Sequence, residues 1–288
     1  MRPSISRVLL AGAVLAAMSG CATVDLTNEW PAMVEPTGWE PKAGACSSSF
    51  AEATYRSAYT PTDCTKVHSY ETVHIGQFTG DAAALDKPPT KGSTALGAAW
   101  AECDKKTSEY LGGLWRDAKI EIGVSVPSPG NWEGGARWFR CEAAAKRTQF
   151  GTTMTWTSSL KGELAKDSTL KITCFVIPKE DDKEWTEITC DKPHNGEYVG
   201  TYVSNDTWAS GNDKASGEAI HRRCLSVIAG YVGLPDDGNM KYRTGTGFGY
   251  PDEDSWSEGD HSVRCYLYLD KNVTQSLKGG GAKALPIT

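Results

Sequence analysis

Two short motifs place a histidine near a carboxylate, a combination that supports proton transfer or metal binding. They read Cys64-x3-His68-x2-Glu71 and Cys190-x3-His194-x2-Glu197, with an offset of 126 residues. One interpretation is a proton-transfer, ligand-binding or metal site on these pairs. The other is structural: a histidine that hydrogen-bonds a turn after a disulfide, and a glutamate that begins a strand. Side chains three apart on a strand point to opposite faces, so His68 and Glu71 are not expected to converge, and we favour the structural interpretation.

A metal site on the first motif would need further ligands. His74 extends this motif, and His68 and His74 would share one face of a strand. In the second motif Gly200 stands where His74 does, and an oxidised Cys64 is not a thiolate ligand. The chain has no Gly-x-Ser-x-Gly, no His-Glu-x-x-His and no phosphate-binding glycine loop. We therefore expect no metal, no cofactor and no catalytic residue.

Two tryptophans occupy equivalent places beside glycines. Trp132 and Trp256 each precede the last predicted strand of their half of the chain. Exposed aromatic side chains on loops bind glycan or protein surfaces. Their repetition at one position favours the other interpretation, in which each ring covers a core. The candidate binding residues are His68, Glu71, Trp132, His194, Glu197 and Trp256.

The first 20 residues predict an export signal. Arg2 and Arg7 precede an apolar run over residues 8–18, too short for the roughly 20 residues of a membrane-spanning helix. Met18-Ser19-Gly20-Cys21 resembles the bacterial lipobox, so we expect cleavage before Cys21 and acyl chains on its thiol. Residues 21–40 would then be a lipidated tether, and residues 281–288 a disordered tail. Loss of both arginines lowers the formal net charge from −6 to −8, which argues against a nucleic-acid partner.

The other eight cysteines form two sets of four with similar spacing. The sets are Cys46, Cys64, Cys103 and Cys141, and Cys174, Cys190, Cys224 and Cys265. An even number of cysteines in an exported chain predicts disulfides. Three pairings are available within each set, and we favour first with second and third with fourth. The first pair would join adjacent strands, and the second would attach a helix to the last strand.

Further motifs repeat together with the cysteines. They are Cys103-x6-Tyr110-Leu-Gly112 with Cys224-x6-Tyr231-Val-Gly233, Trp132-x2-Gly135-x4-Arg140-Cys141 with Trp256-x2-Gly259-x4-Arg264-Cys265, and Ser159-Leu160-Lys161-Gly162 with Ser276-Leu277-Lys278-Gly279. Such agreement in the same order predicts an internal duplication. We expect two homologous modules, residues 41–165 and 169–280, each long enough to bury a core.

Each module is predicted to have the order strand, strand, strand, helix, strand. In the second module residues 170–177, 185–190, 197–203 and 261–269 have strand patterns. One apolar helix face comprises Ile220, Cys224, Val227, Ile228 and Tyr231, and the first module offers Ala99, Cys103, Thr107 and Tyr110. Gly233 and Gly112 would end these helices. We predict an α+β fold with two tandem disulfide-stapled modules, each a mainly antiparallel sheet with one main helix.

The repeated motifs together resemble the septum-formation domain family, found mostly in exported and membrane-tethered proteins of high-GC Gram-positive bacteria. The resemblance rests on Cys190-Asp191-Lys192-Pro193-His194-Asn195-Gly196-Glu197, the helix cysteine with Tyr-x-Gly, the Trp-to-Arg-Cys motif and the Ser-Leu-Lys-Gly close. It covers most of residues 41–280 twice, with Val67 where the family prefers proline. The resemblance implies a role in the cell envelope near the division septum, with no enzymatic activity.

We therefore expect a non-enzymatic binding or scaffolding lipoprotein on the outer face of the cytoplasmic membrane. Its partners would be the membrane, through the lipid on Cys21, and an envelope protein or the cell wall. The alternative is an envelope hydrolase or metal-binding protein that uses His68 or His194 with a nearby carboxylate. A solute-binding lipoprotein is disfavoured, because such proteins are usually two-domain α/β proteins with parallel sheets.

Overall fold

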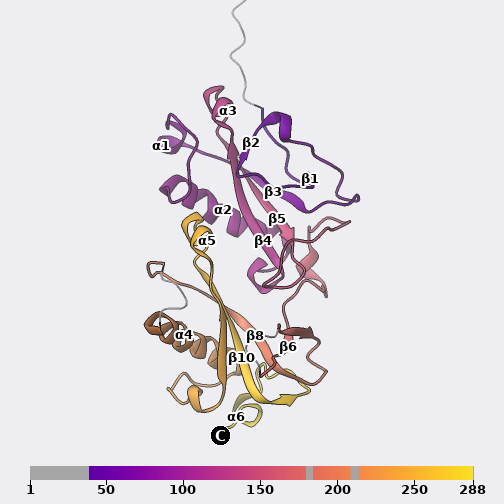
Figure 1. Ribbon diagram of the computed structural model, residues 1–288, viewed down its shortest axis with the longest axis vertical. Helices are drawn as coiled ribbons and strands as arrows, with labels where there is room; N and C mark the ends of the chain where they lie inside the picture. The colour runs from indigo at the N-terminus through magenta and orange to yellow at the C-terminus, as the bar shows by residue number, and fades with distance from the viewer. Residues whose placement is uncertain (1–38, 180–183, 209–213, 288) are drawn as a thin grey trace, which may run out of the picture. The chain divides into compact units, whose positions relative to one another are not determined.

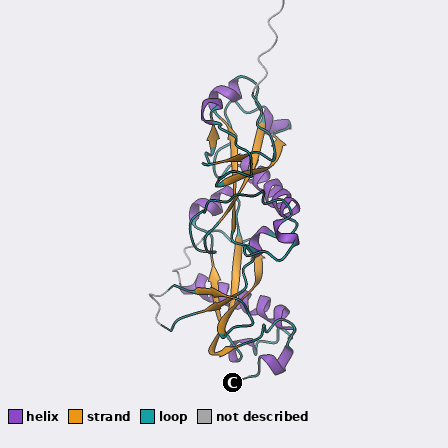
Figure 2. Ribbon diagram, turned by 90° about the vertical axis from the view of Figure 1, so that its right-hand side faces the viewer, coloured by secondary structure: helices purple, strands orange, loops and turns teal. Residues whose placement is uncertain are grey.

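Two five-stranded sheets organise the part of the chain that the structure describes. The computed structural model describes residues 39–179, 184–208 and 214–287, so the predicted export signal and Cys21 lie outside it. The strand order is β1-β3-β5-β4-β2 in the first sheet and β7-β6-β8-β10-β9 in the second (Figure 1). One long helix packs on each sheet, α2 on the first and α4 on the second (Figure 2). The predicted α+β class, with one main helix for each sheet, is confirmed.

The first sheet is mainly antiparallel. Its strands are β1 (Cys46–Ser47), β2 (Ala53–Thr54), β3 (Tyr70–Gln77), β4 (Ile120–Pro127) and β5 (Trp138–Ala145). β5 is central and pairs antiparallel with β3 and β4, whereas the short β2 is parallel to β4. The shorter helices of this half are α1 (Gly80–Ala83), α3 (Pro129–Glu133), η1 (Arg56–Ala58), η2 (Trp115–Asp117) and η3 (Glu163–Ala165).

The strands of the second sheet pair antiparallel throughout. They are β6 (Cys174–Val176), β7 (Thr186–Ile188), β8 (His194–Val203), β9 (Gly245–Gly249) and β10 (Ser262–Val273). β10 lies between β8 and β9 and is the longest strand. The shorter helices of this half are α5 (Glu253–Glu258), α6 (Gly281–Ala284) and η4 (Met240–Tyr242).

Apolar faces and terminating glycines explain where the two long helices form and end. The Ser93 hydroxyl caps α2 (Thr94–Leu111) by accepting a hydrogen bond from the Leu96 amide at 3.2 Å. The buried face of α2 has the spacing of a helix and consists of Leu96, Ala99, Trp100, Cys103, Thr107 and Leu111. Gly112 ends it with a φ of 76°, and Gly233, with a φ of 75°, follows α4 (Lys214–Val232). Both predicted helix ends are confirmed.

Four disulfides join the cysteines in the predicted pairs. They are Cys46–Cys64, Cys103–Cys141, Cys174–Cys190 and Cys224–Cys265. The second and fourth attach α2 to β5 and α4 to β10, as expected from the sequence. The first and third differ from the prediction in one detail. Cys64 and Cys190 lie in turns, so these bonds join a strand to the turn before the next strand.

The structure corrects the predicted strand order. β4 and β9 lie between the long helix and the last strand of each half, where the sequence predicted only loops. β9 has the sequence Gly-Thr-Gly-Phe-Gly, and glycine weakens the sequence signal of a strand. The predicted strand over residues 170–177 is shorter, since only Cys174–Val176 pair as β6. The loops that carry Trp132 and Trp256 begin with short helices, α3 and α5.

Both ends of the described chain pack onto the fold. Residues 281–287 are ordered rather than disordered, because Leu285 is buried and its carbonyl accepts a hydrogen bond of 2.6 Å from Arg243. The predicted tether also ends early, because the Trp39 carbonyl accepts a hydrogen bond of 2.6 Å from the Trp138 indole. Among the described residues, no helix has the length and apolar character needed to cross a membrane.

Candidate functional site

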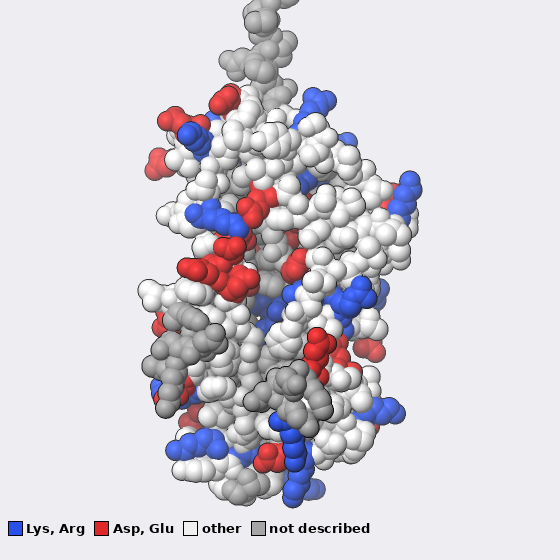
Figure 3. All heavy atoms as spheres, in the orientation of Figure 1, with Lys and Arg blue, Asp and Glu red and all other residues white. Residues whose placement is uncertain are grey.

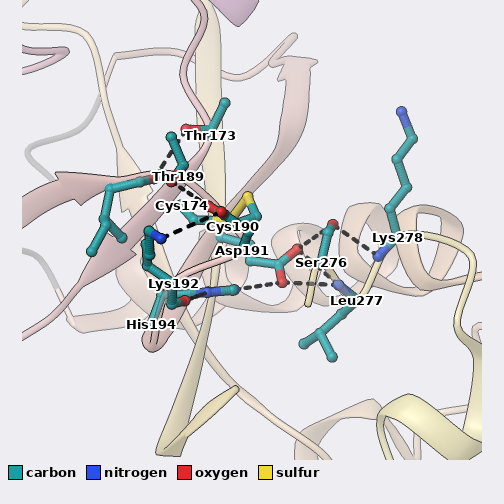
Figure 4. Close-up of a disulfide and its surroundings, with 12 residues drawn as sticks. Thr173, Cys174, Thr189, Cys190, Asp191, Lys192, His194, Ser276, Leu277 and Lys278 are labelled. Carbon is teal, nitrogen blue, oxygen red and sulfur yellow. Dashed lines mark hydrogen bonds and ion pairs between the residues drawn. A yellow bond between two sulfur atoms is a disulfide. The ribbon is translucent and has the colours of Figure 1, made fainter. Parts of the chain in front are cut away.

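The carboxylate of Glu197 is the meeting point of three segments of the second half. Glu197 lies on β8 and is 1% exposed. Its oxygens accept hydrogen bonds from the Tyr231 hydroxyl of α4 at 2.8 Å, the Ser276 hydroxyl at 3.0 Å and the Leu277 amide at 2.9 Å. His194 completes the set, with Nε2 3.0 Å from a carboxylate oxygen (Figure 4). Strand, helix and closing segment are thereby joined at one buried charge.

The protons of His194 follow from its neighbours. Nδ1 lies 2.7 Å from the Lys192 carbonyl oxygen, which only accepts hydrogen bonds, so Nδ1 carries a proton. Nε2 faces the Glu197 carboxylate, which is also an acceptor. A proton must therefore lie between Nε2 and the carboxylate, and the two side chains form a buried hydrogen-bonded pair. Each ring nitrogen and each carboxylate oxygen of the set has a protein partner.

The first half contains a matching set around Glu71. This carboxylate lies on β3 and is fully buried. It accepts hydrogen bonds from the Tyr110 hydroxyl of α2 at 2.5 Å, the Ser159 hydroxyl at 2.6 Å and the Leu160 amide at 2.7 Å. These residues occupy the same motif positions as the partners of Glu197. The Tyr-x-Gly and Ser-Leu-Lys-Gly motifs therefore supply hydrogen-bond donors to a buried glutamate.

The histidines of the two sets differ. His68 Nδ1 lies 2.8 Å from the Lys66 carbonyl, as in the second set, but its buried Nε2 has no hydrogen-bond partner among the described residues. The expectation that His68 and Glu71 would not converge is wrong, because their ligand atoms lie within 4.8 Å of each other, although no hydrogen bond joins them. The equivalent pair, His194 and Glu197, is hydrogen-bonded. His194 is the first residue of β8, beside a register shift in the pairing with β10, so regular strand alternation does not hold there. The predicted bond from each histidine to a turn is confirmed.

The tyrosines remain hydrogen-bond donors over the physiological pH range. Burial, with a further contribution from the Glu71 carboxylate, raises the pKa of Tyr110 to about 12. Burial also raises the pKa of Tyr231, which faces Glu197. Both hydroxyls therefore keep their protons and donate to the carboxylates.

Two groups of side chains approach the spacing of metal ligands. The ligand atoms of Cys46, His68 and Glu71, and those of Cys174, Cys190 and His194, lie within 4.8 Å of one another. All three cysteines belong to disulfides, and a disulfide sulfur is not the thiolate that binds Zn²⁺. Neither group fits a metal ion while the protein is oxidised.

The two candidate tryptophans are buried in the core. Trp132 is 1% exposed and donates from its indole to the Leu85 carbonyl at 2.7 Å. Trp256 stacks on the His261 ring, with centroids 4.3 Å apart, and on Tyr250 at 5.2 Å. Neither ring presents an open face to a partner. Their burial supports the interpretation in which each tryptophan covers a core.

The geometry of the two sets favours a structural role over proton transfer. A general base must reach a proton of its substrate, whereas His68, Glu71, His194 and Glu197 are all buried. Sequence reasoning singled out these four residues but missed that Tyr110, Tyr231, Ser159 and Ser276 bind the glutamates. The repetition of these tyrosine and serine motifs was the signal that connected them.

Comparison with known proteins places the fold in a family. The family model described as septum formation matches residues 43–265, a single match that begins before Cys46 and reaches into β10 of the second sheet. No curated protein and no solved structure is detectably similar to the chain. The matched region covers most of the chain and contains both glutamate sets, except for Ser276 and Leu277 of the second set. The chain therefore belongs to the septum formation family.

Proposed function

We propose that this protein is a non-enzymatic binding or scaffolding lipoprotein of the bacterial cell envelope that acts in septum formation. The observation that carries the proposal is the match to the septum formation family over residues 43–265. The four disulfides support an extracytoplasmic location, because such bonds persist where the compartment is oxidising. Acylated Cys21 would hold the chain on the outer face of the cytoplasmic membrane.

The assignment of Cys21 draws support from the disulfide pairing. The chain has nine cysteines, and the four disulfides use eight of them. Cys21 is the remaining one, and it follows the apolar run and small residues of an export signal. Two or three acyl chains on this thiol would give durable anchoring, whereas one alone binds a membrane weakly.

We also infer that the two sheets are copies of one module. Each has a long interior strand, a long helix attached to it by a disulfide, and a glutamate bonded to a tyrosine, a serine and a main-chain amide. Equivalent hydrogen bonds at equivalent motif positions support a duplication. Two copies would present two related surfaces from one anchor, which suits a scaffold that holds partners near the membrane.

The alternative, a hydrolase or metal-binding protein that uses His68 or His194, receives less support. Both histidines are buried, and the sulfurs nearest to them are oxidised. A substrate would have to displace the closing segment around Leu160 or Leu277 to reach either glutamate. We therefore propose a binding role rather than a catalytic one.

Anchoring is tested by membrane fractionation with radiolabelled fatty acid. The full chain should carry the label and sediment with membranes, and Cys21→Ser should lose the label and be released. Ser19→Ala, which retains a small residue in the lipobox, is the matched control and should behave as wild type. Affinity capture of the labelled protein from dividing cells then tests the scaffold, which should retain envelope division proteins. Label on Cys21→Ser would overturn the anchor.

A further inference from the structure

A cavity lies where the two sheets of the described chain meet. It has a volume of about 400 Å³, within the usual range for small-molecule sites. The residues that argue for a ligand are Glu121, Lys146 and Gln149 on one side and Asp252 and Arg264 on the other. We call this cavity the junction cleft. Figure 3 shows a hollow on this face of the molecule, with acidic and basic side chains around it.

The walls of the junction cleft are fixed by contacts between the two halves. Arg264 donates from Nε to the Arg116 carbonyl at 2.9 Å, and the Gly92 amide donates to the Ser257 carbonyl at 2.9 Å. Lys91 forms an ion pair of 2.8 Å with Glu258. These contacts join the loop before α2 and the turn after it to α5 and β10, so the cleft is preformed. A preformed site loses little entropy when it binds a ligand.

Two opposite charges on one wall lack ion-pair partners. Glu121 on β4 is paired with Ala144 of β5, and Lys146 follows two residues after Ala144, so both side chains lie on the same face. Among the described residues neither forms an ion pair, and the Lys146 ammonium donates only to the Gln149 carbonyl, at 3.4 Å. Burial raises the pKa of Glu121 and lowers the pKa of Lys146. Asp252 and Arg264 are the other charges that act on Lys146.

A buried amide adds a third polar group. Gln149 lines the cleft and is 4% exposed, and its Oε1 has no hydrogen-bond partner in the described chain. Buried polar groups usually have partners, and leaving one unpaired costs about 1–3 kcal/mol. The cleft thus combines a carboxylate, an ammonium and an amide. The two charged groups have no ion-pair partner in the described chain, and the amide oxygen has no hydrogen-bond partner there.

We propose that the junction cleft binds a small zwitterion, an amino acid or short peptide with a free amine and a free carboxylate. Glu121 would receive the ammonium group, and Lys146 and Arg264 the carboxylate. An uncharged sugar fits the cleft less well, because the Trp100 and Trp115 rings that line it are only 5% and 3% exposed and offer no open stacking face. This inference gives a ligand class to the proposed binding function and rests on it.

The test is calorimetric titration of the full lipidated, oxidised protein in detergent with the dipeptide alanyl-alanine. N-acetyl-alanyl-alanine, which lacks the ammonium, and alanyl-alanine amide, which lacks the carboxylate, are the matched ligands. Each blocked form should bind about tenfold or more weakly, since a charge-assisted hydrogen bond is lost. Equal binding of all three peptides, or no saturable binding by any of them, would overturn the proposal, and so would tighter binding of N-acetylglucosamine.

Variants assign each charge to its ligand group. Glu121→Gln should remove the preference for the free amine, and Lys146→Met should weaken the preference for the free carboxylate. Glu218→Gln, an exposed residue on α4, is the control and should bind as wild type. If a variant fails to fold, the comparison of free and blocked peptides on the wild-type protein still tests the proposal. If the wild-type protein binds no peptide but still localises to the septum, the zwitterion ligand is rejected and the proposed function stands. If the wild-type protein does not localise to the septum, the proposed function itself is rejected.

Discussion

Removing the Glu197 carboxylate should destabilise the second half strongly. In Glu197→Ala the Leu277 amide and His194 lose their buried partner, while the Tyr231 and Ser276 hydroxyls, 3.0 Å apart, still bond each other. Each uncompensated buried group costs about 1–3 kcal/mol, and breaking a buried charge pair costs about 3–5 kcal/mol. We expect a loss of about 4 kcal/mol in the free energy of unfolding, which is a large fraction of the stability of one domain.

Two measurements report this loss. Urea unfolding of the oxidised chain gives the global change, with the slope compared between variants to confirm that the same surface is exposed. Amide hydrogen exchange gives the local change, because the Leu277 amide is buried and bonded only to Glu197. A drop of about 3 kcal/mol in the local opening free energy accelerates its exchange by about 100-fold.

Two matched variants sharpen the result. Glu71→Ala leaves the Leu160 amide without its partner but breaks no bond to His68, so its cost should be smaller than that of Glu197→Ala by about 1–2 kcal/mol. Glu218→Ala, exposed on α4, should lie within about 0.5 kcal/mol of wild type. A Glu197→Ala protein as stable as the Glu218 variant, with unchanged exchange at Leu277, would refute the reasoning.

Three further predictions concern separate groups. The pKa of Tyr110 is raised from an ordinary 10.0 to about 12, so the stabilising contribution of this hydroxyl is present below pH 10 and is lost as the pH rises toward 12. Ultraviolet titration of the wild type against Tyr110→Phe measures this pKa. Ionisation of Tyr110 at pH 10 would contradict the prediction. Replacing Cys174 and Cys190 by serine opens a loop of 16 residues and should cost about 3 kcal/mol in urea unfolding, and an unchanged midpoint would argue against this bond. Trp256→Ala should cost about 3–5 kcal/mol as a core substitution, whereas a binding tryptophan would leave stability intact.

The sequence predicted the elements that depend on local signals. Cysteine spacing repeated in both halves and so indicated the disulfide pairs, since a cysteine on a helix face and one on the last strand are natural partners. Gly112 and Gly233 adopt the left-handed conformation that ends each helix, and glycine adopts it at little cost. The helix ends were predictable because few neighbouring residues determine them, and the disulfide pairs because the same cysteine spacing occurs in both halves.

The sequence did not predict the features that depend on distant contacts. Ser276 bonds Glu197 across 79 residues, and no local pattern shows that the closing motif returns to β8. His194 meets Glu197 because a register shift interrupts regular pairing at the start of β8, which alternation rules do not anticipate. The junction cleft combines residues from both halves, so it follows only from how they pack.

Fluorescence microscopy of dividing cells tests the central claim most directly. The full chain, fused at its C-terminus to a fluorescent protein that matures outside the cytoplasm, should accumulate at the division site, and Cys21→Ser should lose this pattern because its anchor is gone. The account predicts a band at the septum that appears with constriction. An even distribution around the envelope at every stage of division would contradict it.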